Sequence, residues 1–221
     1  MRILYATERA SAPWKNGGGV TQEVMIWPNG APLDDFEWRI SIADILTDGP
    51  FSKFPGISRV LTVIQGDGLR LAIAGAESLD LDSTSPPLSF AGDVGCHATL
   101  TKGPIRDLNL MARRDVYSVS ARRLHVVGDT VIRCDAETTL AIALDPLICG
   151  GERLKSEDAA LAASGENLRV TASTARVVIA EISPFSQRAD AGAYSGHQKS
   201  TNIRTELFKE QSGGANTQLR K

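Results

Sequence analysis

The sequence has few residues of the kinds that build metal centres and disulfide frameworks. Its 221 residues include three cysteines and three histidines. The cysteines are Cys96, Cys134 and Cys149, and the histidines are His97, His125 and His197. They form neither a Cys-x-x-Cys pair nor a His-x-His pair, so the spacing indicates no disulfide framework and no zinc or other metal site. We therefore expect no metal ion, no cofactor and a reducing, cytoplasmic compartment.

Long apolar runs and an excess of positive charge are also missing. No stretch approaches the ~20 apolar residues of a membrane helix, and Arg2 and Glu8 interrupt the first residues before a signal-type apolar region could form. The formal net charge is -2, and the basic pairs at 113–114 and 122–123 are isolated rather than part of a stripe. We therefore expect neither a membrane nor a nucleic acid as partner.

The sequence does contain a series of short apolar runs separated by turn residues. With 42% apolar and 23% charged residues, the chain has a globular composition and suffices for one sizeable core or two small ones. Strands are predicted over 21–27, 37–43, 59–65, 68–74, 78–81, 88–91, 97–101 and 107–111. The Asp67-Gly68 turn predicts a β-hairpin between the third and fourth of these. Many short strands without helical periodicity favour an all-β fold, either an antiparallel sandwich or a barrel.

The later part of the chain repeats this pattern in weaker form. Strands are expected over 117–121, 125–127, 131–134, 140–144, 168–171 and 176–182. Residues 156–165 are compatible with a helix, because they are rich in alanine, and equally with a strand. We therefore expect a first unit over 1–114, a second, smaller β unit over 115–185 and a polar C-terminal tail over 186–221.

Two of the predicted strands carry a polar row opposite an apolar face. Since side chains two apart share a face of a strand, Arg39 and Ser41 oppose Trp38 and its apolar neighbours. In the same way Asp107 and Asn109 oppose two leucines. Such rows either face water or line an interior cavity that holds a small ligand.

The loops on both sides of the 37–43 strand combine aromatic rings with charges. Trp14, Lys15 and Asn16 precede the strand, and Asp48 and Phe51 follow it. Aromatic walls with a few fixed polar groups suit a small anionic ligand. Simple packing of the tryptophan over the sheet is an equally good explanation of that residue alone.

The charged candidates have complementary roles in such a site. Arg39 or Arg113 can clamp a carboxylate through two N–H groups, and Lys15 can add a point charge. Asp48 and Asp107 can orient these cations or accept a hydrogen bond from a ligand N–H.

Familiar catalytic and phosphate-binding motifs are not present. The run Gly17-Gly18-Gly19 is not a phosphate loop, because the lysine precedes the glycines and a strand rather than a helix follows. No Gly-x-Ser-x-Gly elbow or equivalent pattern marks a nucleophile, so we assign no catalytic residue.

Several longer motifs resemble the HutD/Ves family. They are PWKNGGG at 13–19, FEWRISIA at 36–43, DGPFSKFPGISR at 48–59, GDGLRL at 66–71 and DLNLM at 107–111 followed by Arg113. The resemblance is dense from about residue 13 to residue 114 and thins to fold-level similarity through roughly residue 185. Ser58 stands where the family's pattern leads us to expect an acidic residue.

The resemblance implies a bicupin, that is, two cupin-like antiparallel β-barrels, which forms a homodimer and is linked to histidine utilisation. It also implies a regulator rather than an enzyme, with a small carboxylate such as urocanate or formylglutamate as ligand. Together with the residue patterns, it gives a metal-free ligand site. The expected ligand-binding residues are Trp14, Lys15, Asn16, Arg39, Ser41, Asp48, Phe51, Asp107, Asn109 and Arg113.

Two other functional classes stay open. One is an enzyme acting on such an acid, by amide hydrolysis or isomerisation, with Asp48, His97 or Asp107 as acid or base. The other is a protein-interaction module whose aromatic patch contacts a partner. A carboxylate in an accessible cavity would favour the enzyme, and a closed apolar interior would favour the interaction module.

Overall fold

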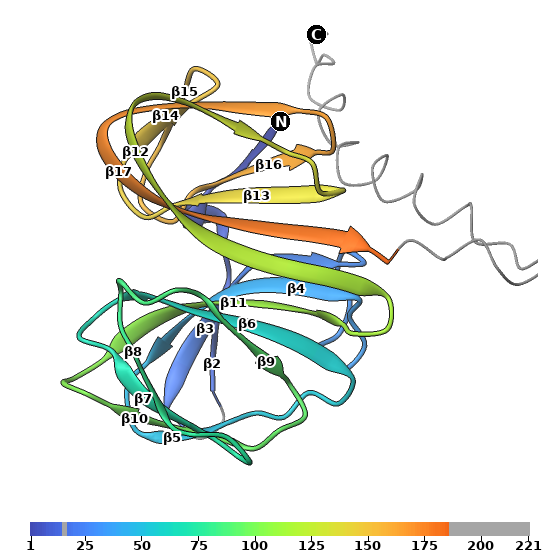
Figure 1. Cartoon of the computed structure of the whole chain (residues 1–221), viewed down its shortest axis with the longest axis vertical. Helices are drawn as coiled ribbons and strands as arrows, with labels where there is room; N and C mark the ends of the chain where they lie inside the picture. Colours follow the sequence, from blue (N-terminus) through green and yellow to red (C-terminus); the bar gives the residue numbers. More distant parts are fainter. Residues whose placement is uncertain (15–16, 186–221) are drawn as a thin grey trace, which may run out of the picture.

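The computed structural model describes residues 1–14 and 17–185, which form three antiparallel sheets (Figure 1). This part of the chain contains one 3-10 turn, η1 (Ala6–Glu8), and no α-helix, so none of its helices could cross a membrane. The all-β, antiparallel prediction is confirmed. Lys15, Asn16, His197 and the predicted tail over 186–221 lie outside the described residues.

The first two sheets are built from residues 11–113. Sheet B has the order β2 (Ser11–Pro13), β3 (Gly19–Trp27), β4 (Trp38–Ile45), β11 (Ile105–Arg113), β6 (Ile57–Gln65) and β9 (Leu88–Ala91). Sheet C has the order β5 (Gly49–Phe51), β10 (Cys96–Leu100), β7 (Leu69–Ile73) and β8 (Leu79–Leu81). Strands β2 and β5 were not predicted, because each is only three residues long.

The hairpin predicted at residues 65–68 is wrong. Strand β6 pairs with β11 and β9, whereas β7 pairs with β10 and β8, so the turn leads from sheet B to sheet C. Gly66 and Gly68 both have positive φ, and a Cβ at Gly68 would lie 2.3 Å from the carbonyl oxygen of Leu81. The glycines therefore allow the chain to turn tightly from sheet B to sheet C. Because hairpin turns also contain glycine, the sequence does not distinguish the two cases.

Sheet A contains seven strands, of which two are very long. They are β12 (Tyr117–Arg133), β17 (Asn167–Pro184), β13 (Thr138–Ala143), β16 (Ala159–Ala163), β14 (Leu147–Cys149), β15 (Glu152–Leu154) and β1 (Arg2–Leu4). The separate strands predicted over 117–134 merge into β12, and those over 168–182 merge into β17. The ambiguous residues 156–165 contain β16, so a strand rather than a helix forms there.

Strand β1 pairs with β16, which places the first residues of the chain in the sheet formed by residues 117–184. This arrangement is visible at the top of Figure 1, where the N-terminus lies beside β16. The division of the chain at residues 114 and 115 stays a prediction.

The largest buried cluster lies between sheets A and B. It brings Trp38, Ile40 and Ile42 of β4 against Leu140 and Ile142 of β13. Trp38 is 0% exposed, so its ring is part of this core, in agreement with its predicted place on the apolar face of the strand. Full burial of one such side chain contributes about 1.5–3 kcal/mol. Because this cluster contains the most buried side chains, it is the main apolar contact between the sheets. Two further clusters lie between sheets B and C and inside the curl of sheet A.

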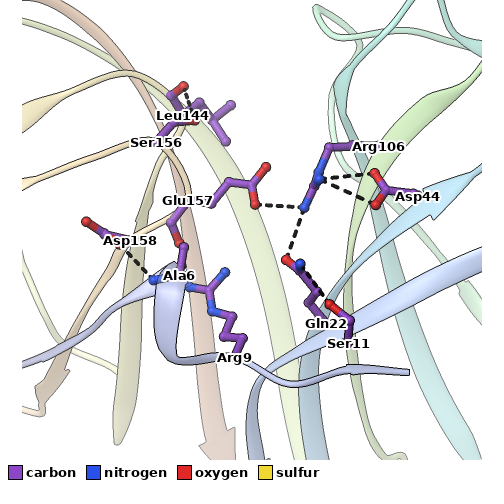
Figure 2. A network of polar contacts seen from close by, with 10 residues as sticks. All are labelled: Ala6, Arg9, Ser11, Gln22, Asp44, Arg106, Leu144, Ser156, Glu157 and Asp158. Atoms are coloured by element: carbon purple, nitrogen blue, oxygen red, sulfur yellow. Dashed lines mark hydrogen bonds and ion pairs between the residues drawn. The ribbon is translucent and has the colours of Figure 1, made fainter. Parts of the chain in front are cut away.

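At the edge of this interface, polar side chains connect sheet B to the loop before β16 (Figure 2). Arg106 Nη1 lies 3.1 Å from an oxygen of Asp44, and Arg106 Nη2 donates to Gln22 at 3.2 Å and to the Glu157 carboxylate at 2.9 Å. Arg9 donates to the backbone oxygen of Glu157. Glu157 has a φ of 71°, an unfavourable conformation for a residue with a side chain. Interactions at both its side chain and its carbonyl hold it there.

Asp158 next to it fixes the N-terminal segment to sheet A. Its carboxylate accepts hydrogen bonds from the backbone N–H of Ala6 and of Lys155, each at 2.7 Å, and the residue is only 3% exposed. The Asp158 carboxylate thus connects two backbone segments that are far apart in sequence.

We expect Asp158→Ala to lower the free energy of unfolding by about 1–3 kcal/mol, because it leaves the partly buried N–H groups of Ala6 and Lys155 without their acceptor. Asp158→Asn retains one acceptor oxygen and should lose less. Urea unfolding followed by tryptophan fluorescence measures both. Asp80→Ala, which removes an exposed ion pair with Arg70, is the control and should leave the midpoint unchanged. An Asp158→Ala midpoint equal to that of the control would show that these two hydrogen bonds do not stabilise the fold.

Candidate functional site

The face of sheet B that is turned towards sheet C carries a cluster of polar side chains. Arg39 and Ser41 of β4 and Asp107 and Asn109 of β11 lie on this face, since the alternate residues belong to the core against sheet A. The predicted alternation of both strands is therefore confirmed. The register places Asn109 opposite Ser41 and Met111 opposite Arg39. The polar rows thus face the space between two sheets rather than bulk water.

The centre of the cluster is a buried chain of three side chains. Arg59 of β6 donates from Nε at 2.8 Å and from Nη2 at 2.5 Å to Asn109 Oδ1. Asn109 Nδ2 in turn donates to Asp107 Oδ1 at 2.9 Å. These residues are 6%, 4% and 0% exposed respectively. A neutral amide therefore transmits the interaction between a buried cation and a buried carboxyl group.

Two aromatic rings flank the Arg59 guanidinium. Its Cζ atom lies 4.6 Å from the ring centroid of Phe51 and 5.5 Å from that of Phe90. Both distances are within the range of cation–π attraction. Burial lowers the pKa of Arg59, while the nearby Asp107 acts in the opposite direction. Nη1 of Arg59 has no hydrogen-bond partner among residues 1–14 and 17–185.

Asp107 combines complete burial with an unsatisfied oxygen. Its Oδ2 atom is inaccessible and has no hydrogen-bond partner in the described part of the chain. Burial raises the pKa of Asp107 to about 7, against the opposing effects of the Arg59 charge and the Asn109 hydrogen bond. Asp107 therefore changes its charge near neutral pH, unlike an exposed aspartate.

A second arginine approaches from the other side of β11. Arg39 Nε donates to Glu23 at 3.0 Å and Nη1 donates to Ser41 Oγ at 3.1 Å, which leaves Nη2 without a partner in the described residues. Met111 pairs with Arg39 on one side and with Arg59 on the other. Because neighbouring strands are about 4.8 Å apart, the two arginine backbones are separated by roughly 10 Å.

Trp14 packs against the cluster between sheets B and C and donates from its indole nitrogen to Thr21 Oγ1 at 2.8 Å. A Cβ at Gly19 would lie 2.4 Å from the carbonyl oxygen of Asp44 and 3.1 Å from two atoms of the indole ring. Glycine is therefore required at position 19, which gives the last residue of the Gly17-Gly18-Gly19 run a packing role.

Two predicted site residues lie apart from this cluster. Asp48 accepts a hydrogen bond from the backbone N–H of Leu100 at 2.8 Å and so connects the residue before β5 to the end of β10. Arg113 forms an ion pair with Asp35 at 2.6 Å and donates to the Phe36 carbonyl at 3.3 Å. His97 alternates with the buried Cys96 and Ala98 and is exposed. Of the three acid–base candidates, only Asp107 lies between the sheets.

Three members of the cluster were missed in the sequence. Arg59 is the one charged residue within the apolar strand 57–65, and that isolation is a signal that could have identified it. Glu23 is a single charge on β3, and the sequence does not show that its partner is Arg39 on the neighbouring strand. Phe90 lies on β9 and meets Arg59 only through the register of two strands far apart in sequence, which no local pattern reveals.

An open cleft of about 870 Å³ lies at the end of sheet B where β4 begins and β11 ends. Its lining comes from three loops and consists of Leu33, Asp34, Phe36, Ser52, Lys53, Phe54, Pro55, Gly56, Ile57, Arg113, Arg114 and Asp115. Arg113 is the one predicted site residue in this lining. Ile57 and Phe36 also pack with Met111, so the cleft and the polar cluster are separated by this apolar contact.

No group of three or more histidine, cysteine, aspartate or glutamate side chains in the part of the chain described by the structure could hold a metal ion. The donors present are arginines, amides and single carboxylates, a set suited to an anion rather than to a metal.

The architecture is that of a cupin-fold protein. A cupin 2 conserved barrel domain protein from Leptotrichia buccalis has the same fold, with a TM-score of 0.53 over 82% of this chain and 96% of that protein, at 8% identity. The sequence defines the group more narrowly. The HutD family model matches residues 6–180, and the chain belongs to the HutD family.

Individual relatives agree with this assignment. The crystal structure of the conserved protein PA5104 from Pseudomonas aeruginosa PAO1 is 36% identical, with a TM-score of 0.73 over 82% of this chain and 98% of that one. HutD from Pseudomonas fluorescens SBW25, solved in a formate condition, is 35% identical, with a TM-score of 0.72 over 84% and 99%.

Two further relatives are similar to this chain in sequence. An uncharacterized 21.2 kDa protein from the hutC 3' region of Pseudomonas putida is 39% identical over 65% of this chain and 73% of that protein. Protein Ves of Citrobacter koseri is 43% identical, and the match spans 46% of this chain and 52% of Ves. The resemblance to the HutD/Ves family is therefore confirmed.

The raised pKa of Asp107 predicts a specific dependence of stability on pH. Between the unfolded pKa of about 3.9 and the folded pKa of about 7, the folded protein holds a proton that the unfolded chain releases. The free energy of unfolding should therefore fall as pH rises through this range, by at most about 1.4 kcal/mol per pH unit.

Asp107→Asn removes this dependence, so its stability relative to the parent protein should improve steadily from pH 4 to pH 7. Urea unfolding at one-unit intervals measures the difference. A difference between the two proteins that stays constant over this range would show that Asp107 keeps an ordinary pKa.

Proposed function

We propose that the protein binds a small carboxylate between sheets B and C without a metal ion, and that this binding regulates histidine utilisation. In this proposal sheets B and C close into one cupin barrel and sheet A into a second, smaller one, which makes the protein a bicupin. The working form is a cytoplasmic homodimer. The ligand is an acid of the size of urocanate or formylglutamate.

The observation that carries the proposal is the pair Arg39 and Arg59. Both are fixed by hydrogen bonds to neighbouring side chains, both lie on one face of sheet B, and each keeps one terminal guanidinium nitrogen without a partner among the described residues. Guanidinium groups match the planar geometry of a carboxylate and are less strongly hydrated than ammonium groups. Two such donors in a buried site favour a small anion over a neutral ligand.

The surroundings supply contact with the remainder of the ligand. Phe51, Phe90 and Trp14 give aromatic surface, and Ser41 and Asn109 give neutral polar groups. Asp107 Oδ2 has no hydrogen-bond partner in the described residues and is inaccessible, so Asp107 acts on the ligand through its charge and through Asn109 rather than by direct contact.

The regulatory part of the proposal rests on the relatives. One of them is named for its place in the hutC 3' region, and another is named HutD. The absence of a nucleophile signature in the sequence agrees with a sensor, and a sensor needs selective binding rather than turnover.

An enzyme acting on the same acid is the second candidate, and Asp107 is the residue that favours it. A buried carboxyl group with a pKa of about 7 can serve as a general acid or base at neutral pH. His97 and Asp48 lie outside the cluster, so amide hydrolysis or isomerisation would have to depend on Asp107. Incubation of the bound acid with the protein, followed by chromatography of the acid, separates the two candidates.

We expect one acid among urocanate, formylglutamate, glutamate and formate to bind the chelator-treated protein in isothermal titration calorimetry. At about 100 times its dissociation constant it should stabilise the protein by about 2.7 kcal/mol. Arg39→Gln should weaken binding at least tenfold, because a charged hydrogen bond contributes about 1.5–3 kcal/mol.

Arg70→Gln is the matched control, since Arg70 forms an exposed pair with Asp80 in the same part of the chain. It should leave the affinity unchanged. Equal affinities for the two variants, or no binding of any of the four acids, would remove the carboxylate site.

A further inference from the structure

The cleft at the end of sheet B has the features of a second ligand site. Its volume of about 870 Å³ falls within the range of roughly 300–1,000 Å³ that is typical of small-molecule pockets. Three separate loops, at 33–36, 52–57 and 113–115, contribute to it, and none of the residues of the Arg39 and Arg59 cluster line it. The proposed carboxylate site therefore does not account for the cleft.

The floor of the cleft is apolar and fixed. Phe36 and Ile57 are 3% and 7% exposed and pack with Ile26 and Met111. Phe54 meets Phe36 edge to face, with ring centroids 6.2 Å apart and planes at 61°. Leu33, which also lines the cleft, is 54% exposed. The cleft thus offers a preformed apolar surface for a ring or branched chain.

Two adjacent arginines border this surface, and neighbouring backbone carbonyls hold both of them in place. Arg113 donates from Nε to the Phe36 carbonyl at 3.3 Å, and Arg114 donates from Nη2 to the Ile57 carbonyl at 3.0 Å. Arg113 Nη1, together with Arg114 Nε and Nη1, donates to no described residue. Free donors next to an aromatic floor are the features that an acid with an apolar body requires.

The ion pairs that Arg113 and Arg114 already form do not prevent them from binding such an acid. Arg113 pairs with Asp35 and Arg114 with Asp93, and all four side chains are at least 42% exposed. Ion pairs between exposed groups contribute little, so both arginines can take a further anion with little loss. The lining itself contains three basic side chains, including Lys53, and two acidic ones.

We propose that the cleft binds a monoanionic acid with an aromatic or branched apolar body. The acid group contacts Arg113 and Arg114, and the body lies on Phe36, Phe54 and Leu33. This site is separate from the one between sheets B and C, and its ligand has a larger apolar part.

The test uses 3-phenylpropionate as the probe and 3-phenylpropanamide as its uncharged counterpart. Titration of the isotope-labelled protein, followed by amide and arginine Nε–H resonances, should shift signals from 33–36, 52–57 and 113–115. We expect a dissociation constant of about 5 mM or lower for the acid, and binding of the amide at least tenfold weaker. No shift at these residues up to 20 mM, or equal binding of acid and amide, would overturn the proposal.

Variants separate this site from the proposed function. Arg113→Gln and Phe54→Ala should each weaken the probe at least fivefold, while Arg39→Gln and the surface control Arg70→Gln should not. Conversely, Arg113→Gln should leave the binding of the small acid unchanged. Loss of probe binding in Arg39→Gln would merge the two sites into one and end the claim for a separate ligand.

Discussion

The packing of sheet B on sheet A is the contact on which the rest of the molecule depends. Trp38, Ile40 and Ile42 enter the core shared with Leu140 and Ile142, and a shift by one residue would move all of them to the opposite face. Because this core fixes the alternation, it also fixes Arg39 and Ser41 on the face towards sheet C. The site is thus positioned by apolar packing that lies behind it and contains none of its residues.

The sequence was sufficient for the fold class, for most strands of residues 19–113 and for which residues share a strand face, because these follow from local alternation. It left open whether the polar rows face water or the interior. It was insufficient where the outcome depends on partners far along the chain. The turn at 65–68 joins two sheets instead of two paired strands. Asp48 has a structural role, since it connects the residue before β5 to the end of β10. Arg59 was missed, although an isolated charge in an apolar strand needs a partner.

The buried cation explains why the cluster has this composition. Among the residues that the structure describes, no carboxylate contacts Arg59 directly, since Asn109 stands between it and Asp107. Breaking a buried charge interaction by removing one partner costs about 3–5 kcal/mol, so these three residues constrain one another. Their arrangement also keeps part of the guanidinium available, because a direct ion pair with Asp107 would occupy more of its donors. Incomplete neutralisation is what makes the cluster suitable for an anion.

The pairing of β1 with β16 has a consequence for biosynthesis. Arg2 pairs with Leu161, and Asp158 binds the backbone of Ala6, so β1 cannot pair until β16 has been translated. Sheets B and C, in contrast, contain strands from residues 11–113 alone and can pair before the rest is translated. Sheet A is therefore the last of the three sheets that can be completed, and β1 stays unpaired until then.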